Sequence, residues 1–220
     1  FAYTIDSCEV GEVVIENFNA AAGEIVFTGV SAHPMSAKGV MVNPLLMAHD
    51  FIAAFDRAET PEHTEGREGY VWFIELTAHA SQAHLKLAIR DFDRESFARR
   101  KRKVAEVADA IAARYPTGRV SCSVTDTYGN ISDSLGDDRR SVDRLLAAMA
   151  ELKIEPKLIP MRGGTDGAAL SARGLPTPNF FTGAYNFHSR FEFLPVPAFD
   201  TAFAVARALC REPAGTEPLS

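Results

Sequence analysis

Hydrophobic and polar positions alternate along several short stretches of the chain, and this period of two predicts β-strands. The stretches with this pattern, or with β-branched and aromatic residues, are 2–6, 10–18, 24–30, 70–77, 83–91 and 119–127. A helical period begins after Asn43, a cap followed by Pro44, and continues to about Ala58; a second helix is predicted from Asp93 to Tyr115. The order from residue 24 to 127 is therefore βαββαβ, which predicts a ferredoxin-like unit with two helices on one face of an antiparallel sheet.

The rest of the chain predicts a different architecture. Its expected elements are a helix at 138–152, a strand at 157–160, a glycine-rich turn at 162–167, a short helix ended by Gly174, strands at 175–181 and 191–196 around a loop, and a helix at 197–210. Strands that alternate with helices predict a parallel or mixed α/β sheet with ligands at the strand ends. We expect residues 1–18 and 128–220 to form this sheet together, with residues 19–127 inserted between them as a separate domain. Residues 211–220 are expected to be a frayed tail.

Composition narrows the class of protein. The 220 residues carry 23 Lys and Arg against 29 Asp and Glu, a net charge of −6, so the chain has no general attraction for nucleic acid or anionic lipid. The cysteines Cys8, Cys122 and Cys210 lie far apart without a Cys-x-x-Cys pair, which is typical of reduced thiols and predicts a cytoplasmic protein. We expect neither a membrane-spanning helix nor a signal peptide.

Two residues near strand ends could ligate a metal. His188 lies in the loop YNFHSRFEF, where an imidazole can act as a zinc ligand or a general base, or can be a polar surface residue. Asp6 ends the hydrophobic strand TID, where its carboxylate can face a ligand or cap a turn.

The turn RGGTDG offers a binding site for a carboxylate. Arg162 can hold such a group with two hydrogen bonds, and the glycines let the backbone approach a ligand; the alternative is a turn in which Asp166 is a helix N-cap. The spacing and the lysine of a phosphate-binding loop are absent. His33, in the loop SAHPMSAKG, is a weaker candidate, and the basic run at 99–103 predicts a solvated helix face.

Taken together, these motifs resemble one family. YTID, ENFNAA, HP…AKG…VNP, IRDFD, RGGTDG, GLPTPN and NFHSRFEF occur in this order, from about Ala2 to Phe203, and resemble the C-terminal half of peptidase T, a family of cytosolic tripeptide aminopeptidases with two zinc ions. The resemblance implies a homodimer formed through the ferredoxin-like lid domain. It also implies roles for single residues: Asp6 and His188 as ligands of the two different zinc ions, His33 reaching the partner subunit's active site, Arg162 holding the peptide carboxylate, and Asn130 and Arg90 contacting substrate.

The chain departs from the family pattern in ways that affect activity. It has no His-x-Asp pair, no bridging aspartate and no Glu-Glu pair, so we expect it to bind zinc weakly and to be inactive alone. Ser7 and Met35 stand where the family has glycine, and Ile131 where methionine is common. Two alternatives stay open: a related dipeptidase, carboxypeptidase or amidohydrolase, and a non-catalytic dimerisation module.

Overall fold

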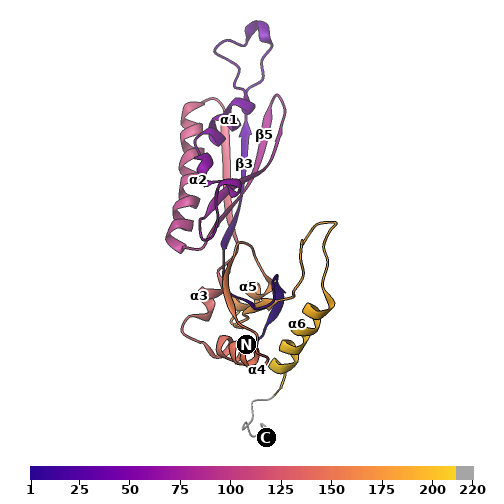
Figure 1. Ribbon diagram of the computed structural model, residues 1–220. Coiled ribbons are helices and arrows are strands. Elements are labelled where there is room, and N and C mark those ends of the chain that lie inside the picture. The colour runs from indigo at the N-terminus through magenta and orange to yellow at the C-terminus, as the bar shows by residue number, and fades with distance from the viewer. Residues whose placement is uncertain (212–220) are drawn as a thin grey trace. The chain divides into compact units, whose positions relative to one another are not determined.

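The computed structural model describes residues 1–211; the predicted frayed tail lies, from residue 212, outside the described residues. The chain divides into two compact units (Figure 1). Unit 1 comprises Phe1–Asn17 and Gly129–Ser220, and unit 2 comprises Phe18–Tyr128. The fold class is mixed α/β, as predicted.

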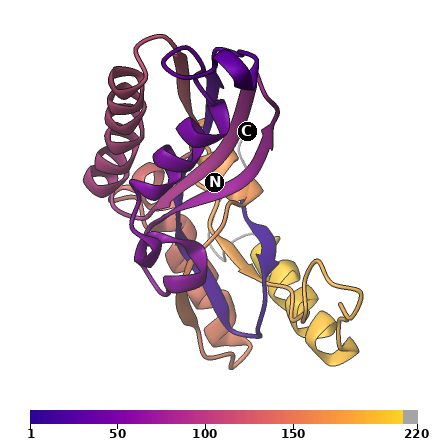
Figure 2. The same ribbon diagram turned by 90° about the horizontal axis from the view of Figure 1, so that it is seen from above.

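Unit 2 is a four-stranded antiparallel sheet covered on one face by two helices (Figure 2). Its elements are β3 (Asn19–Thr28), α1 (Pro44–Ala53), β4 (Tyr70–Ala78), β5 (Gln82–Asp91), α2 (Arg94–Arg114) and β6 (Arg119–Tyr128), with short 3₁₀ turns η1 (Pro34–Ser36), η2 (Arg57–Glu59) and η3 (Pro61–His63). The strand order is β4-β5-β3-β6. The predicted βαββαβ arrangement is confirmed.

The core of unit 2 follows from alternation along β3. Ile25 and Phe27 are fully buried and face Phe51 of α1 and Val104 of α2. Each large apolar side chain buried in this way contributes about 1.5–3 kcal/mol. Gly23 keeps the centre of the sheet closely packed, because a Cβ there would lie 2.7 Å from Leu87 Cδ1.

The helix boundaries of unit 2 are set by capping side chains. Asn43 Oδ1 accepts from Leu45 N at 2.9 Å, and Asp93 Oδ1 accepts from Ser96 N at 2.7 Å, both at predicted starts. The prediction that α1 continues to about Ala58 is wrong, because the helix ends at Ala53. Asp56 instead caps η2 by accepting from Ala58 N, a local bond that competes with the helix.

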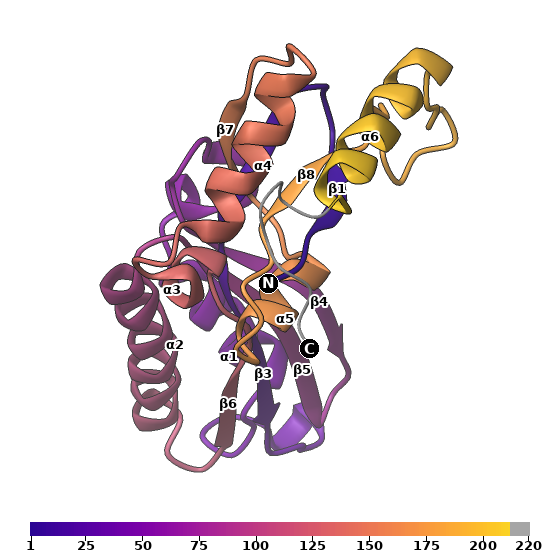
Figure 3. The ribbon, with the colours of Figure 1, turned by 90° about the horizontal axis from the view of Figure 1, so that it is seen from below.

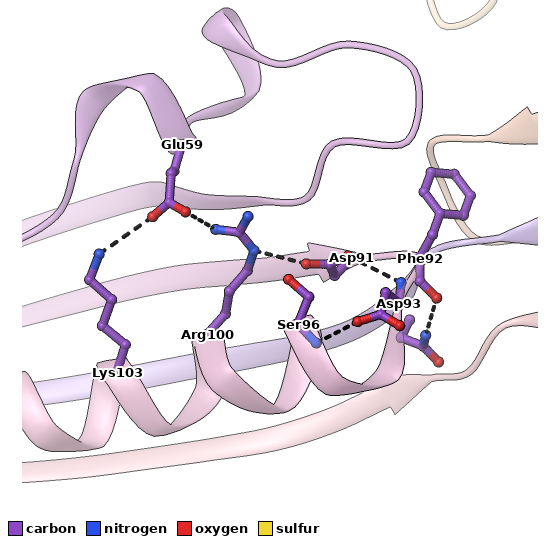
Figure 4. A network of polar contacts seen from close by, with 8 residues as sticks. Glu59, Asp91, Phe92, Asp93, Ser96, Arg100 and Lys103 are labelled. Atoms are coloured by element: carbon purple, nitrogen blue, oxygen red, sulfur yellow. Dashed lines mark hydrogen bonds and ion pairs between the residues drawn. The ribbon is translucent and has the colours of Figure 1, made fainter.

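A polar network joins the segment after α1 to the rest of unit 2 (Figure 4). Arg100 of α2 donates from Nε to Asp91 Oδ2 at 2.9 Å and pairs through Nη1 with Glu59 Oε1 at 2.9 Å. Lys103 reaches the other oxygen of Glu59 at 3.4 Å. Asp91 is 4% exposed, and Gly69 passes so close that a Cβ would lie 2.4 Å from its Oδ2. The network therefore fixes the η2–η3 segment over β5 and α2.

Unit 1 is a small mixed sheet with helices (Figure 3). Its elements are β1 (Thr4–Ser7), β2 (Glu12–Asn17), α3 (Ile131–Leu135), α4 (Arg140–Glu151), β7 (Lys157–Met161), α5 (Asp166–Ser171), β8 (Asn179–Phe181) and α6 (Val196–Leu209). The strand order is β1-β8-β2-β7; β1 is parallel to β8, β2 is parallel to β7, and β2 is antiparallel to β8. Helices α4 and α6 share a core with Val13, Phe180 and Phe181 of the sheet.

Several predictions for unit 1 need correction. The strand expected at 191–196 is absent; Phe193 forms only an isolated bridge with Tyr185. The strand expected at 175–181 is reduced to β8, because Pro176 and Pro178 have no N–H to donate to a sheet. The helix α3 was not predicted, since five residues are too few to show a helical period. No helix within residues 1–211 is long and apolar enough to cross a membrane.

Candidate functional site

The candidate site begins at the end of β1, where Asp6 projects from the edge strand of unit 1. Loss of hydration raises the pKa of Asp6, the carboxylate of Asp166 raises it further, and His188 opposes both. Asp6 thus lies within electrostatic range of an acidic group on α5 and of an imidazole in the loop after β8. Three segments that are distant in sequence converge on one carboxylate.

The loop that carries His188 is closed at its base by two aromatic residues. Tyr185 and Phe193 exchange backbone hydrogen bonds of 3.0 and 3.2 Å, and their rings stack at 5.3 Å. His188 has a left-handed backbone with φ of 63°, and its N–H donates to Glu192 Oε2 at 2.8 Å. A left-handed conformation in a non-glycine residue costs free energy, so this loop holds the His188 backbone in a conformation that an open chain would not favour.

Asp166 is a residue whose place in the site sequence reasoning missed. The alternative that Asp166 is the N-cap of its helix is wrong: Thr165 is the cap, accepting from Ala168 N at 3.1 Å, and Asp166 is the first helical residue. Gly167 brings the helix start against β1, because a Cβ there would lie 3.0 Å from Thr4 Oγ1. The sequence feature that could have identified Asp166 as a site residue is an acidic side chain within a glycine-rich turn.

Arg162 follows β7 and is half-buried at the beginning of the glycine-rich turn. Strand β7 is parallel to β2, and β2 is antiparallel to β8, so β7 and β8 end at opposite ends of the sheet. Arg162, which follows β7, therefore lies at the end opposite to the His188 loop, which follows β8. The described residues therefore bring Asp6, Asp166 and His188 together, whereas Arg162 approaches from the other end of the strands.

The donors at this site do not by themselves form a complete metal centre. A carboxylate and an imidazole are suitable ligands for zinc, and a catalytic zinc has about three protein ligands. Among residues 1–211, no group of three or more His, Cys, Asp or Glu side chains could hold a metal ion. The residues of this chain alone therefore do not fit a dinuclear centre.

His33 lies in an exposed loop of unit 2 that extends beyond the end of the sheet (Figure 1). The base of this loop is fixed by two backbone hydrogen bonds of 2.9 Å between Val30 and Val42. His33 Nδ1 accepts from Met35 N at 3.2 Å, so a neutral ring carries its proton on Nε2. The geometry leaves Nε2 as a donor.

Arg90 and Asn130 both make structural contacts with residues that lie close to the points where the chain passes between the two units. Arg90 Nη1 donates to the carbonyls of Ala21 and Ile89 at 3.2 and 2.9 Å, and its guanidinium lies 5.4 Å from the centre of the Tyr128 ring. Asn130 is 3% exposed, and its Oδ1 accepts from Asn17 N at 2.9 Å. Contact of either residue with substrate stays a prediction.

The amino-acid sequence is similar to a known protein family and to several known proteins. The family described as "Peptidase dimerisation domain" matches residues 15–119. A peptidase T-like protein of Rhizobium meliloti is 65% identical over 96% of this chain and 52% of its own length, and a peptidase T of Clostridium perfringens is 42% identical over 93% and 50%. The chain thus spans about half the length of these relatives.

Solved structures support the same fold. A tripeptidase from Staphylococcus aureus matches 95% of this chain and 56% of its own with a TM-score of 0.80 at 18% identity. A Bacillus subtilis protein described as a dinuclear metal-binding peptidase of the M20 family matches 94% and 54% with a TM-score of 0.66 at 17% identity. These identities show the fold alone. By sequence, the chain corresponds to a fragment of the peptidase T family that spans about half the length of the matched members, and its residues 15–119 match a peptidase dimerisation domain.

Proposed function

We propose that this chain is the dimerisation domain and part of the catalytic domain of a zinc-dependent tripeptide aminopeptidase that acts in the cytoplasm. The observation that carries the proposal is the place of Asp6 and His188, two donor types that zinc accepts: Asp6 lies near the end of β1 and His188 in the loop after β8, and these paired parallel strands end at the same end of the unit 1 sheet. Similarity to the peptidase T family supports the reaction class, and the metal described for a structural neighbour supports a metal centre.

The chain alone is proposed to be inactive. Two candidate ligands directed at two different ions are too few, and the described residues hold no further group that could complete either site. We therefore define the joined protein as this chain linked to the part of the R. meliloti relative that it does not match, and use it to test the function.

Arg162→Ala in the joined protein tests the proposed substrate. A guanidinium that holds the C-terminal carboxylate contributes about 1.5–3 kcal/mol, so we expect kcat/KM for a tripeptide to fall roughly ten- to a hundredfold. The loss should be much smaller for the same tripeptide with an amidated C-terminus. The measurement is release of the N-terminal residue, with the chain alone as the blank.

Other outcomes of this assay favour the alternatives. Equal losses for free and amidated peptides would show that Arg162 does not hold the carboxylate. Cleavage at the C-terminus, or hydrolysis of dipeptides or carbamoyl substrates in place of tripeptides, would indicate a related carboxypeptidase, dipeptidase or amidohydrolase. No hydrolysis of any of these with metal added would indicate a non-catalytic dimerisation module.

We propose that the protein forms a homodimer through the β4 edge of unit 2. The two open edges of this sheet differ in chemistry: β6 presents Ser121 and Ser123, whereas β4 exposes Trp72, Ile74 and Leu76 by 47–50%. Beside β4, a groove of about 920 Å³ runs between this strand and α1, with a floor that includes Phe55, Phe73 and Leu76. A two-fold pairing of β4 with its copy satisfies the open backbone groups and covers the groove.

Ile74→Lys is expected to weaken the dimer by roughly thirtyfold or more, because it places a charge in the apolar centre of the interface. The matched control is Ser123→Lys, which adds the same charge at the polar β6 edge and should leave the dimer unchanged. The measurement is molar mass by light scattering over a dilution series. A dimer that survives Ile74→Lys and dissociates with Ser123→Lys would assign the interface to the opposite edge.

His33 is proposed to act in the partner subunit's site. Because β3 runs ten residues at about 3.3 Å each, His33 lies roughly 30 Å along the sheet from the point where the chain enters unit 2. A donor at Nε2 suits an oxyanion that develops during peptide hydrolysis. Distance from the connection to its own unit 1 favours a role in trans.

A further inference from the structure

Helix α6 carries large apolar side chains on its outer face as well as on its buried face. Ala202, Val205 and Leu209 face the core of unit 1 and are at most 8% exposed. On the outer face, Val196, Phe199 and Phe203 recur at helical spacing and are 53–69% exposed. We name these three residues the α6 surface. Asp200 and Arg207 are also exposed on this helix, but three large apolar side chains exposed side by side mark an interaction surface, so the α6 surface calls for a covering partner.

The neighbouring helix provides an internal comparison. Helices α4 and α6 pack on the same core (Figure 3). Arg144 of α4 donates to the carbonyl of Leu209 at 2.8 Å. The outward positions of α4 include Asp143, Ala147 and Glu151, which are charged or small. One helix of this layer is therefore built to face water and the other is not.

The sheet beside α6 is also open to continuation. Strand β1 lies at the edge of the sheet, and Ile5 on it is 46% exposed. Gly183, just after β8, lets α6 begin directly against the sheet, because a Cβ there would lie 2.4 Å from Ala198 Cβ. The α6 surface and the β1 edge thus lie on one part of unit 1, and within residues 1–211 both are left exposed.

We propose that the α6 surface binds the half of a peptidase T-like chain that this sequence does not contain. The matched R. meliloti relative has about as many residues outside the match as inside it, and the S. aureus tripeptidase of the same fold extends well beyond its matched 56%. Those residues supply an occupant of sufficient size. The inference rests on the proposed function only in taking this chain as part of a longer peptidase.

The test places a reporter thiol on the surface. Phe203→Cys is compared with Ala147→Cys, which is exposed on the outer face of α4, in the chain alone and in the joined protein. Labelling by a thiol reagent is followed by peptide mass spectrometry, which separates these sites from Cys8, Cys122 and Cys210. Both sites should react rapidly in the chain alone, and joining should slow Phe203→Cys roughly tenfold or more while leaving Ala147→Cys unchanged.

Three results would overturn the proposal. Equal labelling of Phe203→Cys in both proteins would show that the other half leaves α6 open. Equal slowing of both sites on joining would show general compaction. Protection of Phe203→Cys in the chain alone that increases with protein concentration would assign the surface to a second copy. Because labelling does not require turnover, an inactive but protected joined protein contradicts the proposed function and leaves this inference intact.

Discussion

Asp91→Ala is expected to destabilise unit 2 by about 3–5 kcal/mol, because it removes the acceptor of the buried Arg100 Nε–H and leaves Arg100 to share the carboxylate of Glu59 with Lys103. The Asp91 side chain is 5% exposed and that of Arg100 is 15% exposed, so water replaces little of the lost contact. Asp91 Oδ1 also accepts from Asp93 N at 3.1 Å, next to the cap of α2 (Figure 4). Urea unfolding followed by the fluorescence of Trp72, the one tryptophan of the chain, reports directly on unit 2.

Asp126→Ala is the matched control for this change. Asp126 also pairs with a basic residue of α2, since Lys101 Nζ lies 2.7 Å from its Oδ1, but the Asp126 side chain is 62% exposed. Exposed ion pairs contribute about 0–1 kcal/mol, so this variant should unfold close to the wild type. Comparable losses for Asp91→Ala and Asp126→Ala would mean that burial does not govern the strength of the network.

The architecture of unit 2 could be predicted because its signals are local. Its strands are seven to nine residues long in the pattern and nine or ten in the structure, and its helices begin after Asn43 and Asp93, whose side chains cap them. Unit 1 offered weaker signals. Its strand β8 has three residues, and the apolar run FEFLPV was interpreted as a strand although only Phe193 forms a bridge. The apolar residues Phe191, Phe193 and Leu194 of this run are exposed and not buried in a sheet, so their apolar pattern is misleading.

The sequence allowed the types of residue in the candidate site to be predicted, but not how those residues are arranged in space. Asp6 and His188 were identified because carboxylate and imidazole suit a metal, and the structure brings them within electrostatic range. The approach of Asp166 depends on how α5 packs against β1, and the position of Arg162 depends on β2 and β8 being antiparallel. These relations join segments more than 150 residues apart, so no local pattern could contain them.

Dimerisation and catalysis are linked in this proposal by one histidine. In the joined protein, His33→Ala should remove a donor to the oxyanion, and His188→Ala should remove a proposed metal ligand, so each variant alone is expected to lose about 10²-fold or more in kcat. The two residues belong to different units of the chain. A mixture of the two variants therefore distinguishes action within one subunit from action across the dimer.

If His33 acts in trans, mixing restores activity without any repaired chain. In a heterodimer, the subunit with intact His188 receives an intact His33 from its partner, while the other site carries both defects, so about one half of the heterodimer's activity should return. If His33 acts within its own subunit, both sites stay defective and the mixture remains as inactive as either variant. The measurement is tripeptide hydrolysis after exchange of subunits, with exchange verified by a mass label on one variant. Adding Ile74→Lys to both chains is the control for the interface: it should abolish the recovery by separating the subunits, and recovery that persists in proven monomers would rule out the trans arrangement.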